Sequence, residues 1–162
     1  MKPQDIIVAL KLLSHDSSRT VRDLATCLNL SKSEISNCQS RLIKSYLLNN
    51  DRQVMKANLF EFILFGLKYV FPGELGAPAR GIPTAWGHKL FNQIRAKQIP
   101  VWPDADGQTY GPAIKPLYPK LPKVCRVDPY IYECAASIDA IRVGRTREKV
   151  IAQDYFTSLL KG

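Results

Sequence analysis

The chain has 162 residues, and its 23 Lys and Arg against 14 Asp and Glu give a formal charge of +9. Hydrophobic residues make up 46% of the sequence, enough to bury a core, which excludes a wholly disordered chain. No apolar run approaches the roughly 20 residues that cross a bilayer, and the N-terminus lacks a signal peptide's apolar segment, so we expect a cytoplasmic protein.

Two helices are predicted near the N-terminus. The first follows Pro3, which a first helical turn tolerates, and its apolar face has helical spacing: Ile6, Ile7, Leu10 and Leu13. The second begins at Thr20, with Asp23 three residues later in a capping-box pattern. It ends at Asn29, a residue type that accepts the left-handed conformation of a helix end.

A third helix is predicted from Lys32 to Lys44, where Ser31 and Glu34 form another capping box. Its buried face would hold Ile35, Cys38 and Leu42. Ala25 is the small residue that two closely crossing helices require in a helix-turn-helix. The outward face would be short, polar and basic, which suits phosphates and base edges: Lys32, Ser33, Ser36, Asn37, Ser40, Arg41 and Lys44.

A short β-hairpin, or wing, is predicted next, because the turn-forming residues 49–53 separate two apolar stretches. Arg52 would lie at its tip, within reach of a phosphate or a minor groove. Asn58 and Glu61 then predict the start of a further helix, over Leu59–Tyr69.

The stretch TVRDLATCLNLSKSEISNCQSRLIKSYLL resembles the winged helix-turn-helix domains of MarR-type transcriptional regulators. It departs from them in having Asn29 where Gly is usual and in its very short wing. The resemblance implies that Lys32–Lys44 is a recognition helix, with these groove-facing positions: Ser31, Lys32, Ser33, Ser36, Asn37 and Arg41. It also implies a phosphate contact at Thr20, assisted by Arg19 and Arg22.

These features predict a sequence-specific regulator of double-stranded DNA, a repressor acting as a homodimer. Phosphates would be met by Arg19, Arg22, Lys32, Lys44 and Arg52, and bases would be read by Ser33, Ser36, Asn37 and Arg41. Two alternatives stay open. The pattern could be an ordinary helical hairpin with a solvated face, or the protein could be an antitoxin-like adaptor that binds a partner protein.

Residues 71–127 hold most of the prolines and six of the nine glycines, together with many aromatic residues. Because a solvated tether would not carry so many aromatic side chains, we expect an ordered arm low in regular structure, its aromatic residues packing a core or lining an effector pocket. The run FPGELGAPARGIPTAWG excludes a continuous strand, and Asp106–Gly107 is a candidate turn between extended segments. Arg80 has two possible roles. It could contact a ligand or a partner protein, or it could be an ordinary surface arginine in a loop.

The arm also carries a second resemblance. LKYVFPGELGAPARGIPTAWG followed by PVWPDADGQTYGPAIKPLYP is similar to a group of bacterial winged-helix proteins described as predicted regulators. This resemblance implies a class of protein and no particular chemistry.

Residues 128–162 predict two helices. Asp128–Pro129 is an N-cap followed by a first-turn proline, and Gly144 either ends or interrupts the first helix. By analogy with other winged-helix proteins, we expect these helices to dimerise. A basic cluster is formed by Arg142, Arg145 and Arg147. It would either contact the DNA backbone or pair with Asp139 and Glu148 as a solvated face, and we favour the solvated face.

The predicted fold is therefore mainly α with a small β wing: a winged helix-turn-helix (1–70), the arm (71–127) and C-terminal helices (128–162). The four cysteines lack CxxC spacing and predict neither a zinc site nor a disulfide framework. No Walker loop, nucleophile elbow or HExxH is present, so we expect no enzymatic activity and no cofactor.

Overall fold

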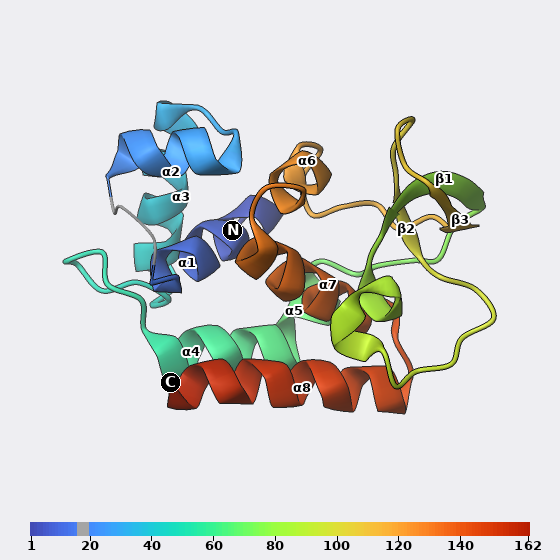
Figure 1. Ribbon diagram of the computed structural model, residues 1–162. Helices are drawn as coiled ribbons and strands as arrows, with labels where there is room; N and C mark the ends of the chain where they lie inside the picture. The colour runs from blue at the N-terminus through green and yellow to red at the C-terminus, as the bar shows by residue number, and fades with distance from the viewer. Residues whose placement is uncertain (16–19) are drawn as a thin grey trace.

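The computed structural model describes residues 1–15 and 20–162, which form a mainly α-helical protein with a small three-stranded antiparallel sheet (Figure 1). None of the described helices combines the length and the hydropathy that a membrane span requires. The N-terminal half contains α1 (Pro3–Leu13), α2 (Val21–Leu28), α3 (Lys32–Lys44), α4 (Lys56–Glu61), the π-helical η1 (Phe62–Gly66) and α5 (Leu67–Val70). The rest contains β1 (Pro78–Pro83), η2 (Ala85–Gly87), η3 (Lys89–Phe91), β2 (Val101–Pro103), β3 (Thr109–Pro112), α6 (Leu121–Cys125), α7 (Pro129–Val143) and α8 (Thr146–Lys161).

Helix α1 lies inside the protein. Its residues 6–10 are fully buried on every side of the helix, which explains why the sequence is continuously apolar there. α1 packs against α3 and α7, and Lys11 Nζ lies 2.7 Å from Asp128 Oδ2 at the start of α7. One buried hydrophobic cluster includes side chains from all three predicted segments of the chain.

The helix after the wing begins earlier than the sequence predicted. It starts at Lys56 and runs without interruption through α4, η1 and α5. The prediction that Asn58 and Glu61 begin this helix was wrong, because both lie within α4. The Asn58 side chain instead donates a hydrogen bond to the Tyr46 carbonyl oxygen, 2.8 Å away, and so ties the helix to the end of α3.

The sheet lies in the arm, at the end of the molecule away from α2 and α3 (Figure 1). Its strand order is β2-β1-β3, so β1 pairs with both other strands. The prediction that residues 78–83 cannot form a continuous strand was therefore wrong. The predicted turn at Asp106–Gly107 between two extended segments is confirmed, because the Gly107 N–H donates a hydrogen bond to the Asp104 carbonyl oxygen at 3.1 Å, between β2 and β3. Proline is tolerated in β1 because Pro78 and Pro83 occupy its two ends.

Glycine at position 81 allows β1 to pass close to β2. A Cβ atom there would lie 1.9 Å from the Trp102 carbonyl oxygen. Arg80, on the same strand, is exposed and lies opposite Tyr110 of β3. The arm thus has a packed sheet with an arginine on its outer surface.

A buried ion pair within α7 is hydrogen-bonded to the arm. The Asp139 carboxylate lies 2.8 Å from Arg142 NH1, and the two side chains are only 2% and 7% exposed. It also accepts hydrogen bonds of 2.8 Å from Thr84 Oγ1 and Trp102 Nε1. Arg142 further donates to the Phe71 carbonyl oxygen. Its predicted pairing with Asp139 is confirmed, whereas the prediction that this pair lies on a solvated face was wrong.

Helix α7 begins as predicted, because the Asp128 side chain accepts a hydrogen bond from the Ile131 N–H at 3.1 Å and Pro129 follows it. It ends at Val143, before Gly144. The inner face of α7 is buried within the chain, including Cys134, Ile138 and Ile141. α8 lies along α4 and α7 (Figure 1).

Candidate nucleic-acid interface

Helix α2 begins as its capping pattern predicted. Thr20 adopts an extended conformation, and its Oγ1 accepts a hydrogen bond from the Asp23 N–H at 3.1 Å. The Thr20 hydroxyl also contacts the Asp23 carboxylate, so Asp23 occupies the helix end where a phosphate contact was predicted. Arg22 is exposed on the first turn, and Arg19 lies outside the described residues.

The turn between α2 and α3 depends on Asn29. Its φ of 53° and ψ of 45° place it in the left-handed region that asparagine tolerates. The Leu30 N–H reaches back to the Ala25 carbonyl oxygen at 3.0 Å, which closes a Schellman motif. Asn29 therefore ends α2 in the left-handed conformation, and the chain turns sharply into Ser31.

Helix α3 has the predicted bounds and two chemically distinct faces. Ser31 Oγ accepts the Glu34 N–H at 3.1 Å, and the predicted inner residues Ile35, Cys38 and Leu42 are fully buried. The outer face is formed by short polar and basic side chains, all exposed, which we call the α3 polar face: Lys32, Ser33, Ser36, Asn37, Ser40 and Lys44. Ser31 is exposed at the end of this face.

Arg41 does not belong to the α3 polar face, and its predicted outward position was wrong. Its guanidinium donates two hydrogen bonds to the Asp5 carboxylate of α1, at 2.7 and 2.9 Å. It also lies 2.8 Å from Glu34 Oε1, and its side chain is only 24% exposed. The reason is electrostatic: Asp5 is fully buried, and a buried carboxylate requires a cationic partner.

The ionic network around Arg41 changes the acidity of its members. Burial would raise the pKa of Asp5, but hydrogen bonds from Arg41 and from the Lys2 N–H bring that pKa below its usual value. The hydrogen bond from Arg41 likewise lowers the pKa of Glu34. Burial raises the pKa of the Cys38 thiol, which makes it a poor nucleophile.

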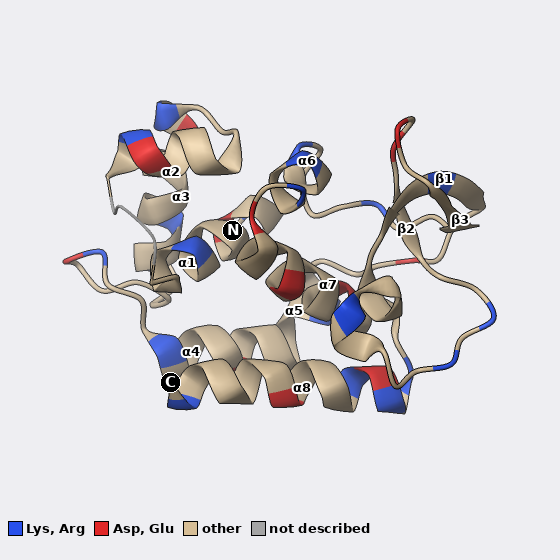
Figure 2. Cartoon of the chain, in the orientation of Figure 1, with Lys and Arg blue, Asp and Glu red and all other residues tan. Residues whose placement is uncertain are grey.

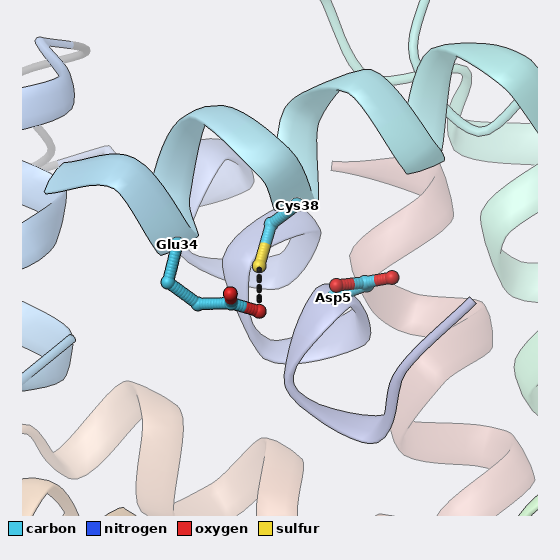
Figure 3. A group of neighbouring side chains, drawn as sticks. All are labelled: Asp5, Glu34 and Cys38. Atoms are coloured by element: carbon cyan, nitrogen blue, oxygen red, sulfur yellow. Dashed lines mark hydrogen bonds between the residues drawn. The ribbon is translucent and has the colours of Figure 1, made fainter. Parts of the chain in front are cut away.

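Figure 3 shows that Glu34 and Cys38 lie one turn apart on α3 and that Asp5 faces them from α1. Three such donors within 4.8 Å of one another could in principle hold a metal ion. Here the guanidinium of Arg41 already occupies the space between the carboxylates and neutralises them, and the thiol remains protonated. We therefore interpret the group as an ion-pair network that fixes α3 on α1.

This network predicts a loss of stability in acid. Because the pKa of Asp5 is lower in the folded protein than in the unfolded chain, the unfolded chain binds protons first as the pH falls below about 5. The stabilisation from ionised Asp5 is present at neutral pH and is lost as the pH falls through the folded-state pKa. The free energy of unfolding should therefore be higher for the wild type than for Asp5→Asn at pH 7, and the difference should shrink toward pH 3.

Urea unfolding followed by circular dichroism at a series of pH values measures this difference. Asp154→Asn is the matched control, because Asp154 is exposed on α8 and should give the wild-type curve at every pH. A difference between wild type and Asp5→Asn that stays constant from pH 7 to pH 3 would contradict the prediction.

The predicted wing is a hairpin with a single β-bridge, between Leu48 and Val54. Its turn is closed by the Asn49 side chain, which accepts the Gln53 N–H at 2.9 Å. Arg52 has a φ of 60° and is exposed at the tip, as predicted. The predicted wing is therefore a short hairpin with one arginine at its tip.

The fold brings together six of the predicted residues on the α3 polar face, and it leaves Thr20, Arg22 and Arg52 exposed on neighbouring segments. Figure 2 shows Lys and Arg both at this end of the molecule and along the arm from β1 to α6. Sequence reasoning missed Asp5, whose only signal was that it is the single acidic residue of α1.

No known protein-family model matches this chain, and neither the curated proteins nor the solved structures include one with significant similarity to it.

Proposed function

We propose that this protein is a winged helix-turn-helix transcriptional regulator that binds double-stranded DNA through the α3 polar face. The observation that carries the proposal is the composition of that face: six short polar or basic side chains, all exposed, on a helix whose other side is fixed in the core. Side chains of these types donate to phosphates and to base edges in the major groove.

The hydrogen bonds of the Glu34 carboxylate support this proposal. Glu34 is the acidic residue of α3, and an exposed carboxylate would repel the DNA backbone. Its carboxylate is instead held by Arg41 at 2.8 Å and by Gln4 Nε2 at 2.9 Å, beside the polar face. The face that remains therefore carries positive charge only, from Lys32 and Lys44.

The proposed roles follow from these positions. Lys32, Lys44, Arg22 and Arg52 would contact phosphates, whereas bases would be read by Ser33, Ser36, Asn37 and Ser40. Arg41 is not among the proposed base-reading residues, because its guanidinium is hydrogen-bonded to Asp5. Two copies acting as a homodimer would meet half-sites about one helical turn apart and would repress by occupying the operator.

The test is fluorescence anisotropy on a randomised duplex pool, with sequencing of the bound fraction at two salt concentrations. We expect a palindromic sequence whose affinity falls steeply with salt. Weak binding without sequence preference that vanishes near physiological salt would contradict the proposal.

Asn37→Ala should weaken binding to the selected duplex by about 1–3 kcal/mol, because an asparagine amide can make two hydrogen bonds to an adenine edge. Its affinity for an unrelated duplex should change little. Asn92→Ala, an exposed asparagine in the arm, is the matched control and should bind like the wild type. An equal loss on both duplexes would exclude Asn37 from base reading.

A second candidate function, a protein-binding adaptor, is favoured by exposed aromatic residues on the 56–70 helix. Phe65 and Tyr69, one turn apart, are 65% and 74% exposed. Large exposed aromatic side chains are typical of protein interfaces. The same anisotropy experiment separates the two candidates, because a pure adaptor would show no sequence preference on DNA.

A further inference from the structure

His88 lies between η2 and η3 of the arm, and it is buried. Only 6% of the residue is exposed, and its ring centroid lies 4.4 Å from that of Tyr132 of α7, in an edge-on contact. The His88 Nδ1 accepts a hydrogen bond from the Leu90 N–H at 3.2 Å, which caps the start of η3. A ring nitrogen that accepts a hydrogen bond carries no proton, so the folded protein holds His88 in its neutral form.

This cap helps to hold the chain between β1 and β2, residues 84–99, which we call the 84–99 segment. Phe91, at the end of η3, is fully buried, and its N–H donates to the His88 carbonyl oxygen at 2.9 Å. Residues 92–99, all of which the structure describes, form neither helix nor strand. The Trp86 indole N–H closes this stretch by donating to the Gln98 carbonyl oxygen at 2.9 Å. The 84–99 segment is therefore anchored at η2 and η3.

Protonation of His88 is incompatible with this arrangement. Both nitrogens of an imidazolium are donors, so Nδ1 could no longer accept the Leu90 N–H, and that N–H would lose its partner. The new charge would also lie out of water against the Tyr132 ring. Burial accordingly lowers the pKa of His88 below its ordinary value.

The titratable and charged groups that face His88 come from η3, α6 and α7: Lys89, Cys125, Arg126, Tyr132 and Glu133. The Glu133 carboxylate favours a protonated ring, but its effect on the pKa of His88 is smaller than that of burial. The Lys89 ammonium lowers this pKa further. Arg126 lines the same cavity, of about 390 Å³, and its charge is paired with Asp104 at 2.9 Å. The surroundings of His88 as a whole therefore favour the neutral ring.

We propose that His88 is a pH-sensitive switch whose protonation releases the 84–99 segment from the rest of the protein. The stabilisation from the neutral ring is present in full above the ordinary imidazole pKa of about 6.5. It is lost as the pH falls from there through the lower pKa of the folded protein. Within this window, each pH unit raises the ratio of open to closed segment by up to about tenfold. The switch does not depend on the proposed function.

The test is hydrogen exchange of the full chain, followed by mass spectrometry at pH 7.5 and pH 5.5. The direct effect of pH on amide exchange is divided out with an unstructured peptide measured in parallel. We then expect the 84–99 segment to exchange up to about tenfold faster at pH 5.5. Helix α3, which lies away from the arm (Figure 1), is the internal reference and should keep the same corrected rate at both pH values.

His88→Asn tests whether this residue is the cause. The asparagine side chain has an oxygen that can accept the Leu90 N–H, and it does not titrate in this range. The variant should therefore show the same corrected exchange of the 84–99 segment at both pH values. His15→Gln is the matched control, because His15 is the second of the two histidines and is exposed, and it should keep the wild-type response. The readout is a ratio within each variant, so it holds even if His88→Asn opens more at both pH values.

Three results would overturn the proposal. The corrected exchange of the wild-type segment could change by less than about twofold, the same increase could persist in His88→Asn, or α3 could open together with the segment. If His88→Asn does not fold, proton NMR of the wild-type histidine rings takes its place, with the signals assigned from the spectrum of His15→Gln. The titration of His88 must then coincide with the increase in exchange, and a ring that titrates while the segment stays closed would equally overturn the switch.

Discussion

Asp139→Asn is expected to lower the free energy of unfolding by about 3–5 kcal/mol, because it removes one partner of a buried ion pair. The amide can still accept hydrogen bonds from Thr84 and Trp102, which the carboxylate accepts now. It cannot neutralise the guanidinium of Arg142, whose side chain is 7% exposed. An uncompensated buried charge is the cause of the expected loss.

Urea unfolding followed by circular dichroism and by tryptophan fluorescence measures this effect. Trp102 hydrogen-bonds directly to Asp139, so its emission also reports whether the arm has separated from α7. Asp154→Asn, on the exposed side of α8, should unfold within about 0.5 kcal/mol of the wild type. A loss below 1 kcal/mol for Asp139→Asn would mean that an unpaired Arg142 is not costly at this site, and would contradict the prediction.

Arg41→Met is expected to destabilise the protein by about 3 kcal/mol, since the fully buried Asp5 carboxylate would lose its cationic partner. Methionine keeps most of the volume of the arginine stem, so the loss measures charge and hydrogen bonding rather than a cavity. Lys44→Met, on the exposed side of the same helix, is the matched control and should change stability by less than about 0.5 kcal/mol.

The double variant Asp5→Asn/Arg41→Met tests the mechanism of that loss. Removing both charges leaves no buried ion without a partner, so the double variant should be more stable than Arg41→Met alone. A double variant as unstable as the sum of the two single variants would show that the residues act independently.

The starts of α2, α3 and α7 could be predicted because their signals are local. The capping residues Thr20 and Ser31, and later Asp128, each act within three residues of a helix start, and the structure confirms all three. The same holds for the end of α2 at Asn29, where a residue tolerant of the left-handed conformation is needed.

The sequence did not predict the sheet, because strands that pair with one another can be distant in sequence. The proline and glycine content of residues 78–83 argued against a strand, yet β1 is the central strand of the sheet. Its prolines lie at the ends, and Gly81 is required by the close approach of Trp102. Only the partners of a strand reveal where proline is tolerated and why glycine is needed.

By itself, the sequence determined that α1, α2, α3, α7 and α8 are helical, where three of these helices begin, and that α3 has one apolar and one polar face. Only the tertiary structure decided which charges remain available on that polar face. The Arg41 guanidinium donates hydrogen bonds to Asp5, 36 residues away in sequence, and to Glu34, which it holds beside the polar face. Helical periodicity assigns a residue to a side of its helix, whereas the desolvation of a buried carboxylate on another helix determines where its guanidinium points.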